Sequence, residues 1–166
     1  IMDIGTGAGF PGVTLKIAFP HLEACLLDSL KKRVNFLEET FDLLKLEDIT
    51  AIHGRAEEFA KNKSYREQYD LCVSRAVSNL ATLSEYCLPY VKVGGHFISY
   101  KSGTVKEELQ QAEKAVKILG GKIQDVVYFN LPDSEIQRSL VVIEKIKTTP
   151  GRYPRKAGTP LKEPLA

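Results

Sequence analysis

Three glycines at alternate positions near the start of the chain constrain its fold more than any other feature. The segment reads Asp3-Ile4-Gly5-Thr6-Gly7-Ala8-Gly9-Phe10-Pro11-Gly12. Glycine lets the backbone turn sharply and approach a ligand without a Cβ in the way. The apolar residues before it are typical of a buried strand. Residues 13–18 are typical of a helix, and Pro11 suits its first turn. A strand, a glycine turn and a helix start predict a site for a nucleotide-type cofactor.

The spacing of the glycines distinguishes two classes of cofactor. The dinucleotide fingerprint Gly-x-Gly-x-x-Gly, counted from Gly5, requires a glycine where this chain has Phe10. Asp3 stands two residues before the first glycine, where an acid repels a pyrophosphate but suits a cationic ligand. S-adenosylmethionine carries an ammonium and a sulfonium and has no phosphate. The spacing therefore favours S-adenosylmethionine over a nicotinamide dinucleotide.

Two further segments add polar groups to this predicted cofactor site. The short apolar run 24–28 ends in Asp28, where an acid at the tip of the second strand can bond ribose hydroxyls. Strand 49–52 is followed by Gly54-Arg55-Ala56-Glu57. Ala56 can hold an adenine through its backbone N–H and Glu57 through its carboxylate. Glu57 also fits as an acid in a first helical turn, so both interpretations stay open.

The rest of the chain alternates between strand-like and helical segments. This order predicts an α/β fold with a mostly parallel, seven-stranded sheet and helices on both faces. Segments 123–131 and 139–146 are joined by a polar loop without room for a helix, so they are predicted to pair antiparallel at one edge. That combination is the Rossmann-like fold of class I S-adenosylmethionine-dependent methyltransferases.

Length and composition indicate one domain, 1–147, followed by a basic tail, 148–166. Because the chain opens inside its first strand, we expect the natural protein to carry a further N-terminal segment. No apolar run approaches the roughly 20 residues of a membrane span, so no membrane partner is expected. Cys25, Cys72 and Cys87 are widely spaced and typical of small buried hydrophobes. The cysteines have neither the spacing of a zinc site nor that of a disulfide framework, so we expect no metal and a reducing cytoplasm. We also expect the protein to be a monomer.

The tail is rich in basic residues, proline and glycine. Arg152, Arg155 and Lys156 occur in it together with Pro150, Gly151, Pro154, Gly158 and Pro160. This composition predicts a segment that packs neither as helix nor as strand and stays mobile or extended. The three cations are expected to contact RNA phosphates, and Tyr153 between them could stack on a base. The alternative is a basic tail that only aids solubility.

The fourth strand ends at Ser74-Arg75-Ala76-Val77, with neither a carboxylate nor a proline. Methylation of an exocyclic amine requires loss of a proton, so this segment argues against such a target. Guanine N7 already has a free lone pair and needs mainly in-line placement. Arg75 is the candidate for substrate positioning, with a surface salt bridge as the alternative interpretation. No general base is assigned.

Taken together, these motifs resemble the bacterial 16S ribosomal RNA 7-methylguanosine methyltransferases, also called glucose-inhibited division protein B. The resemblance is carried by the glycine motif with its Phe-Pro-Gly, by Leu27-Asp28-Ser29, by Arg55-Ala56-Glu57, by Ser74-Arg75-Ala76 and by the ending Tyr153-Pro154-Arg155-Lys156-Ala157-Gly158-Thr159-Pro160. It implies N7 methylation of one guanosine in the decoding region of small-subunit rRNA. It also implies that S-adenosylmethionine is bound through Gly5, Phe10, Ala56, Glu57 and Arg75.

Two other functions remain open at this point. A nicotinamide-dinucleotide oxidoreductase would share the strand–glycine–helix start, but Phe10 and Asp3 count against it. A non-catalytic RNA-binding domain could have kept the fold. The intact glycine loop and Asp28 count against that alternative.

Overall fold

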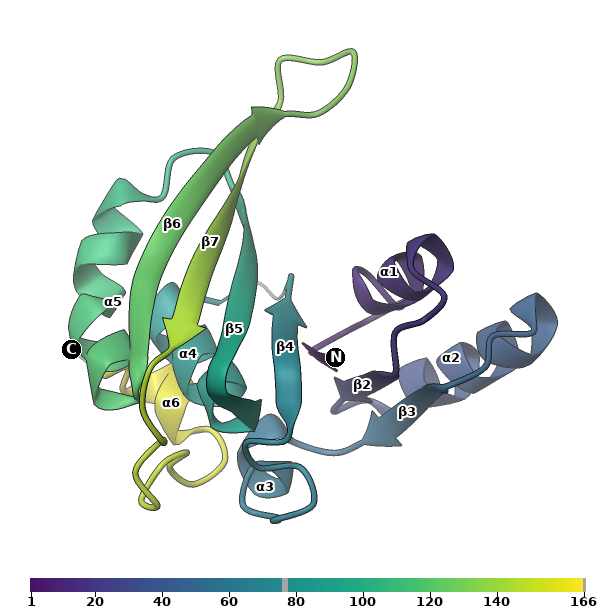
Figure 1. Cartoon of the computed structure of the whole chain (residues 1–166), viewed down its shortest axis with the longest axis horizontal. Helices are drawn as coiled ribbons and strands as arrows, with labels where there is room; N and C mark the ends of the chain where they lie inside the picture. The colour runs from purple at the N-terminus through teal and green to yellow at the C-terminus, as the bar shows by residue number, and fades with distance from the viewer. Residues whose placement is uncertain (76–77, 166) are drawn as a thin grey trace.

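A seven-stranded sheet forms the centre of the computed structural model, which describes residues 1–75 and 78–165 (Figure 1). The strand order is β3-β2-β1-β4-β5-β7-β6. The strands are β1 (Met2–Ile4), β2 (Ala24–Asp28), β3 (Ile49–His53), β4 (Tyr69–Ser74), β5 (Val91–Ser102), β6 (Gly121–Asn130) and β7 (Gln137–Lys145). β7 pairs antiparallel with β5 and β6, and the other neighbours are parallel. The predicted α/β fold with an antiparallel edge pair is confirmed.

Helices cover both faces of this sheet. They are α1 (Gly12–Ala18), α2 (Lys31–Leu44), α3 (Ala56–Phe59), α4 (Leu80–Cys87), the 3-10 helix η1 (Leu88–Tyr90), α5 (Lys106–Ile118) and α6 (Thr159–Lys162). Leu26 packs in one core cluster with residues of α1 and α2, whereas Leu27 packs in another with residues of α3, α4 and α5. Successive strand residues point to opposite faces, so α1 and α2 cover one face and α3, α4 and α5 the other.

The start of β5 contains two consecutive glycines. β5 begins at Val91, and Gly94 and Gly95 lie within it, where glycines more often end an element. Gly94 has φ +88°, and the pairing of β4 with β5 shifts register between Tyr69 and Leu71. The glycines therefore accommodate an irregularity within the strand, because they tolerate a left-handed backbone that other residues resist.

Several loops are tied together at the carboxyl ends of the parallel strands. The N–H of Gly5 donates to the carbonyl of Leu27 at 2.9 Å, and the N–H of Gly54 donates to the carbonyl of Asp28 at 3.0 Å. The hydroxyl of Ser74 donates to the carbonyl of Ile4 at 2.8 Å. The loops after β1, β2, β3 and β4 thus meet at one edge of the sheet, where ligands bind in open α/β folds.

Residues 146–165, here called the C-terminal strap, pack against the domain. Tyr153 is 8% exposed, Pro160 is buried, and the strap contains helix α6 beside α4 (Figure 1). The expectation of a mobile or extended tail, with Tyr153 free to stack on a base, is wrong for the described residues. The reason lies in distant partners: the guanidinium of Arg155, for example, is paired with the buried carboxylate of Glu85 at 2.7 Å.

The cysteines are placed as the sequence predicts. Cys25, Cys72 and Cys87 are all buried and free. Within residues 1–75 and 78–165, no helix has the length and apolar character needed to cross a membrane. Ala76 and Val77, which belong to the motif at the end of β4, lie outside the described residues.

Candidate cofactor and substrate site

Asp3 fixes the shape of the glycine loop from beneath. Its Oδ2 accepts hydrogen bonds from the hydroxyl of Thr6 at 2.6 Å and from the N–H of Gly12 at 2.9 Å. These donors lie at the two ends of the loop, so a single carboxylate oxygen holds both. The carboxylate is fully buried, and its Oδ1 has no hydrogen-bond partner in the part of the chain that the structure describes.

Burial raises the pKa of Asp3 from 3.8 to about 6. The hydrogen bonds from Thr6 and Gly12 and the positive charge of Arg75 act in the opposite direction but do not offset the burial. An ionised carboxylate in this place is therefore under-compensated, and a cation bound at the loop would stabilise it. This electrostatic environment favours a ligand with an ammonium or sulfonium group over a pyrophosphate.

Gly7 leaves open space in front of the loop. Its φ is +63°, and a Cβ added to it would meet no atom within 4 Å. At Gly12, by contrast, an added Cβ would lie 2.7 Å from Oδ2 of Asp3, so that glycine is required by packing within the protein. The space beside Gly7 is where the backbone of the loop can be approached closely by a ligand.

Asp28 lies at the end of β2, as predicted, and holds the loop from the other side. Its Oδ2 accepts from the N–H of Gly7 at 2.9 Å and from Arg33 at 3.2 Å, and its Oδ1 accepts from the N–H of Leu30 at 2.9 Å. The side chain is 2% exposed. Asp28 therefore positions the glycine loop, in addition to the ribose contact predicted for it.

A cavity of ≈ 270 Å³, here called the glycine-loop cavity, opens beside these residues. Its lining includes Gly5, Ser29, Ala56, Glu57, Tyr86 and Leu161. The structure thus brings three of the predicted cofactor residues, Gly5, Ala56 and Glu57, to one cavity. The other predicted cofactor residues, Gly7, Phe10, Asp28 and Arg75, lie outside its lining. Leu161 was missed, because nothing in its local sequence connects it with a loop more than a hundred residues away.

Glu57 has a second partner that the sequence did not reveal. Its side chain is 5% exposed, and its Oε1 accepts a 2.8 Å hydrogen bond from the N–H of Gly158 in the C-terminal strap. The carbonyl of Ala56 accepts a 2.7 Å hydrogen bond from the hydroxyl of Tyr90. The N–H of Ala56, which is the group predicted to bind adenine, takes no part in that bond. Ala56 and Glu57, the pair predicted to bind adenine, are therefore held in place by Tyr90 and by the strap.

A second cavity, of ≈ 830 Å³, lies beyond the ends of β4 and β5. We call it the basic cavity, because its lining includes Arg75, Lys101 and Arg138 and its sole described acid is Glu108. The ammonium of Lys101 is 2.6 Å from that carboxylate. Ser78 lines both this cavity and the glycine-loop cavity, so the two cavities meet at this residue.

Arg75, which lines the basic cavity, contacts the ring of Phe10. The guanidinium carbon of Arg75 lies 5.2 Å from the ring centroid of Phe10, within the range of a cation–π contact. Phe10 is 45% exposed, so its ring is available to a ligand. Phe129 and Arg138 face each other across the β6–β7 ladder and complete the far wall of the basic cavity. The motif analysis missed both, since their position depends on strand register.

The three cations predicted to contact RNA differ in their surroundings. Arg152 and Lys156 are exposed on the strap. Arg152 lies over the ring of Tyr153, with 5.1 Å between the guanidinium carbon and the ring centroid. Arg155 is half-buried and bonded through Nε and Nη2 to both carboxylate oxygens of Glu85. Arg155 therefore has a structural partner, whereas the other two are free to meet a phosphate.

The residues present fit S-adenosylmethionine. The unpartnered Oδ1 of Asp3 and the open space at Gly7 suit its cationic amino-acid half, and the apolar lining around Ala56 suits its adenosyl half. Asp28 and Glu57 add carboxylates at the predicted places.

Comparison with known proteins identifies the family. The family model described as rRNA small subunit methyltransferase G matches residues 1–141. The ribosomal RNA small subunit methyltransferase G of Lachnoclostridium phytofermentans is 56% identical over 165 residues, which cover 99% of this chain and 68% of that protein. That of Clostridium novyi is 55% identical, with 99% and 68% coverage.

Solved structures show the same fold at low identity. A putative transferase of Pyrococcus horikoshii superposes with a TM-score of 0.69 at 14% identity, covering 89% of this chain and 57% of its own. Geranyl diphosphate C-methyltransferase of Streptomyces coelicolor, solved with S-adenosyl-L-homocysteine, gives a TM-score of 0.65 at 11% identity, with 87% and 72% coverage. Because the fold, the glycine-loop site and these relatives agree, the chain belongs to the rRNA small subunit methyltransferase G family of S-adenosylmethionine-dependent methyltransferases.

Proposed function

We propose that this chain transfers a methyl group from S-adenosylmethionine to N7 of a guanosine in the decoding region of 16S rRNA. The observation that carries the proposal is the junction at Ser78, which lines both the glycine-loop cavity and the basic cavity. A cofactor in the first cavity and a nucleotide in the second would meet there. Family membership supports rRNA of the small subunit as the substrate.

Methyl transfer to guanine N7 requires the protein mainly to position the base against the cofactor. The cofactor, when bound, supplies an electrophilic methyl group on a sulfonium, which the N7 lone pair of guanine can accept without loss of a proton. The basic cavity accords with this, because Glu108 is the one acid among its described lining residues. Its Oε1 is engaged by the ammonium of Lys101 and by the N–H of Leu80, each at 2.6 Å. A reaction without a general base is consistent with that arrangement.

The basic cavity has the size and charge to take an unpaired nucleotide. Its volume of ≈ 830 Å³ lies within the range of about 300–1,000 Å³ for small-molecule sites. Arg75 and Arg138 can bond O6 of guanine or the phosphate, and Phe129 offers an aromatic face for stacking. Tight placement of the base against the cofactor is the main catalytic contribution expected of these residues.

RNA outside the cavity would meet the C-terminal strap. Arg152 and Lys156 are exposed there and each can neutralise one phosphate. The same proposal places the chain with the small ribosomal subunit in the bacterial cytoplasm. No observation of the site favours a dinucleotide oxidoreductase or a domain without catalysis.

The test is to map N7-methylguanosine in 16S rRNA from cells with and without the gene, and after complementation. We expect one N7-methylguanosine in the decoding region to vanish with the gene. It should return with the wild-type gene but not with the Gly7→Val variant. An unchanged methylation map in cells that lack the gene would refute the proposal.

A further inference from the structure

Leu161 of helix α6 lies in the wall of the glycine-loop cavity, together with Gly5, Ser29 and Ala56. Its side chain is 60% exposed, so packing in the core does not account for its position. A ligand that fills the cavity would remove apolar surface of Leu161 from water, which favours binding. The family model ends at residue 141, so it assigns nothing to this part of the chain.

We propose that Leu161 is a cofactor-binding residue, which contacts the adenosyl group of S-adenosylmethionine, and that the C-terminal strap thereby forms one wall of the cofactor site. This inference rests on the proposed function, since it takes the glycine-loop cavity as the place of the adenosyl group. It assigns to the end of the chain a role in cofactor binding, where the sequence had suggested contact with RNA alone.

Three polar contacts hold the strap just before Leu161 in the chain. The N–H of Gly158 donates to Glu57 at 2.8 Å, and the carbonyl of Pro160 accepts from the hydroxyl of Thr82 at 2.9 Å. Further toward the start of the strap, Arg155 pairs with Glu85, whose side chain is 1% exposed. Glu57 belongs to α3 and lines the cavity, and Thr82 and Glu85 belong to α4. Leu161 is therefore presented to the cavity by a fixed segment.

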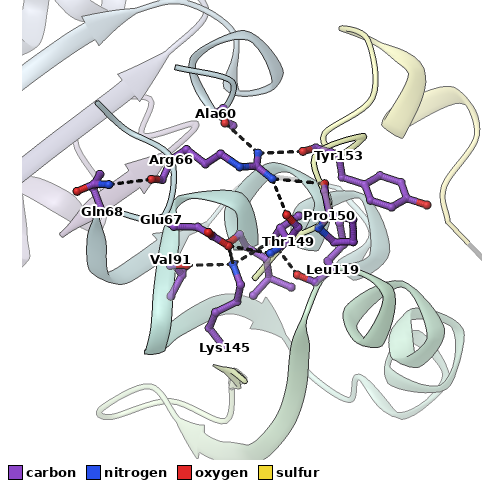
Figure 2. Close-up of polar contacts among 11 residues, drawn as sticks. Ala60, Arg66, Glu67, Gln68, Val91, Leu119, Lys145, Thr149, Pro150 and Tyr153 are labelled. Carbon is purple, nitrogen blue, oxygen red and sulfur yellow. Dashed lines mark hydrogen bonds and ion pairs between the residues drawn. The ribbon is translucent and has the colours of Figure 1, made fainter. Parts of the chain in front are cut away.

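A second set of contacts, drawn in Figure 2, fixes the first half of the strap. Arg66 donates to the carbonyl of Thr149 at 2.7 Å and to that of Tyr153 at 2.9 Å. Glu67 accepts from the N–H of Thr149 at 2.7 Å and lies 3.1 Å from the buried ammonium of Lys145. The strap is thus attached along its length, and its position at the cavity does not depend on one bond.

The chemistry of the cavity indicates which half of the cofactor Leu161 meets. Ile4, Leu27, Leu83 and Leu161 supply apolar surface to the lining, which suits the flat face of an adenine. Asp3 lies under the glycine loop and is absent from that lining. The nucleoside half of S-adenosylmethionine therefore faces Leu161, and the charged amino-acid half faces the loop.

The test compares equilibrium binding of two ligands to the wild type and to Leu161→Ala by isothermal titration. S-adenosylhomocysteine carries both halves of the cofactor, whereas methylthioadenosine lacks the amino-acid half. Losing most of a leucine contact is expected to raise both dissociation constants by about fivefold to twentyfold, and by the same factor. Leu161→Met should stay within about threefold of wild type, because it conserves volume. Leu43→Ala, on α2 and 81% exposed, is the control and should change neither constant.

A second variant enlarges the side chain at position 161 instead of shortening it. Leu161→Trp adds bulk and is expected to obstruct the cavity and abolish binding of both ligands while the protein stays folded. Unchanged constants in both Leu161→Ala and Leu161→Trp would overturn the inference and leave the proposed function standing. Failure of the wild type itself to bind S-adenosylhomocysteine would overturn the proposed function, and the inference with it.

Discussion

The N–H of Gly158 donates a 2.8 Å hydrogen bond to Oε1 of Glu57, which lies 101 positions earlier in the chain. Glu57 is 5% exposed, and a buried carboxylate is costly without a donor. The bond also connects the strap to α3, beside Ala56, which is predicted to bind adenine. A residue that the motif marks as a cofactor ligand therefore also anchors a wall of the glycine-loop cavity.

The glycine loop can be tested with two matched variants. Gly7→Val is expected to abolish binding of S-adenosylhomocysteine, because the side chain would fill the space that faces the ligand. Gly94→Val is the control: Gly94 also has a positive φ and open space around it, but it lies in β5 away from both cavities. Both variants should lose about 1–2 kcal/mol of stability from the left-handed backbone. If Gly7→Val binds the ligand as tightly as Gly94→Val does, the loop is not the cofactor site.

Arg75 is expected to act on methyl transfer. Arg75→Ala removes a cation from the border of the basic cavity and should lower kcat/KM by about tenfold to a hundredfold, the scale of a lost charged hydrogen bond. The control is Lys92→Ala, which removes a surface cation paired with Asp70 at the start of β4. Activity of Arg75→Ala within about twofold of the control would make Arg75 a surface residue.

Cofactor affinity should depend on pH through Asp3. Burial raises the pKa of Asp3 to about 6, so the free protein carries a neutral carboxyl there at pH 5 and a carboxylate at pH 7.5. The cationic S-adenosylmethionine favours the carboxylate, so it should bind about threefold to tenfold more tightly at pH 7.5. Titration calorimetry at both pH values, with Asp3→Asn as the control, measures this. A wild-type profile as flat as that of Asp3→Asn would contradict the role of Asp3.

The raised pKa of Asp3 also makes the free energy of unfolding depend on pH. The folded pKa lies above the unfolded value of 3.8, so this contribution to stability is complete below pH 3.8 and is lost as the pH rises through about 6. Bound cofactor should offset the loss.

The anchor of the strap can be tested through Lys145. Its ammonium is fully buried and donates to the carbonyls of Leu88 and Val91 and to the hydroxyl of Thr149 (Figure 2). Lys145→Ala should lower the free energy of unfolding by about 3–5 kcal/mol, because it leaves Glu67 without its cation. Urea denaturation checks this, with the exposed Lys147→Ala as the control. A difference below about 1 kcal/mol between the two would show that the network does not hold the strap.

RNA contact by the strap predicts a change in salt dependence. The double variant Arg152→Ala/Lys156→Ala should reduce the slope of log affinity against log salt by roughly 1.4–1.8, at 0.7–0.9 for each phosphate contact. Filter binding to 16S rRNA at several salt concentrations measures the slope. Lys122→Ala, an exposed cation on β6, is the control. An identical slope in the double variant would mean that these two cations do not contact phosphates.

The sequence predicted the features that depend on local spacing. Gly5 and Gly7 mark a turn, Asp28 ends a short apolar run, and the short connection before residue 139 forces an antiparallel pair. Each follows from backbone geometry within a few tens of residues. For this reason the predicted order of strands and helices is confirmed as far as β7, while the place of the cofactor loop stays a prediction.

The strap was misjudged because its stability comes from distant partners. A count of charges and prolines describes Arg155 as a free cation and Tyr153 as an exposed ring. In the folded chain the former pairs with Glu85 and the latter is 8% exposed. Composition predicts disorder only when a segment cannot bury enough apolar surface, and here the domain supplies that surface. Leu161 was missed for the same reason.

The central claim is methyl transfer to guanine N7, and the most direct measurement follows the methyl group. The chain would be incubated with S-adenosylmethionine labelled in its methyl group and with small subunits or 16S rRNA that lack the modification. The rRNA would then be digested to nucleosides and separated. We predict label in N7-methylguanosine alone, at no more than one per rRNA, and none with Gly7→Val. Label in another nucleoside, or none from a chain that binds the cofactor, would contradict the account.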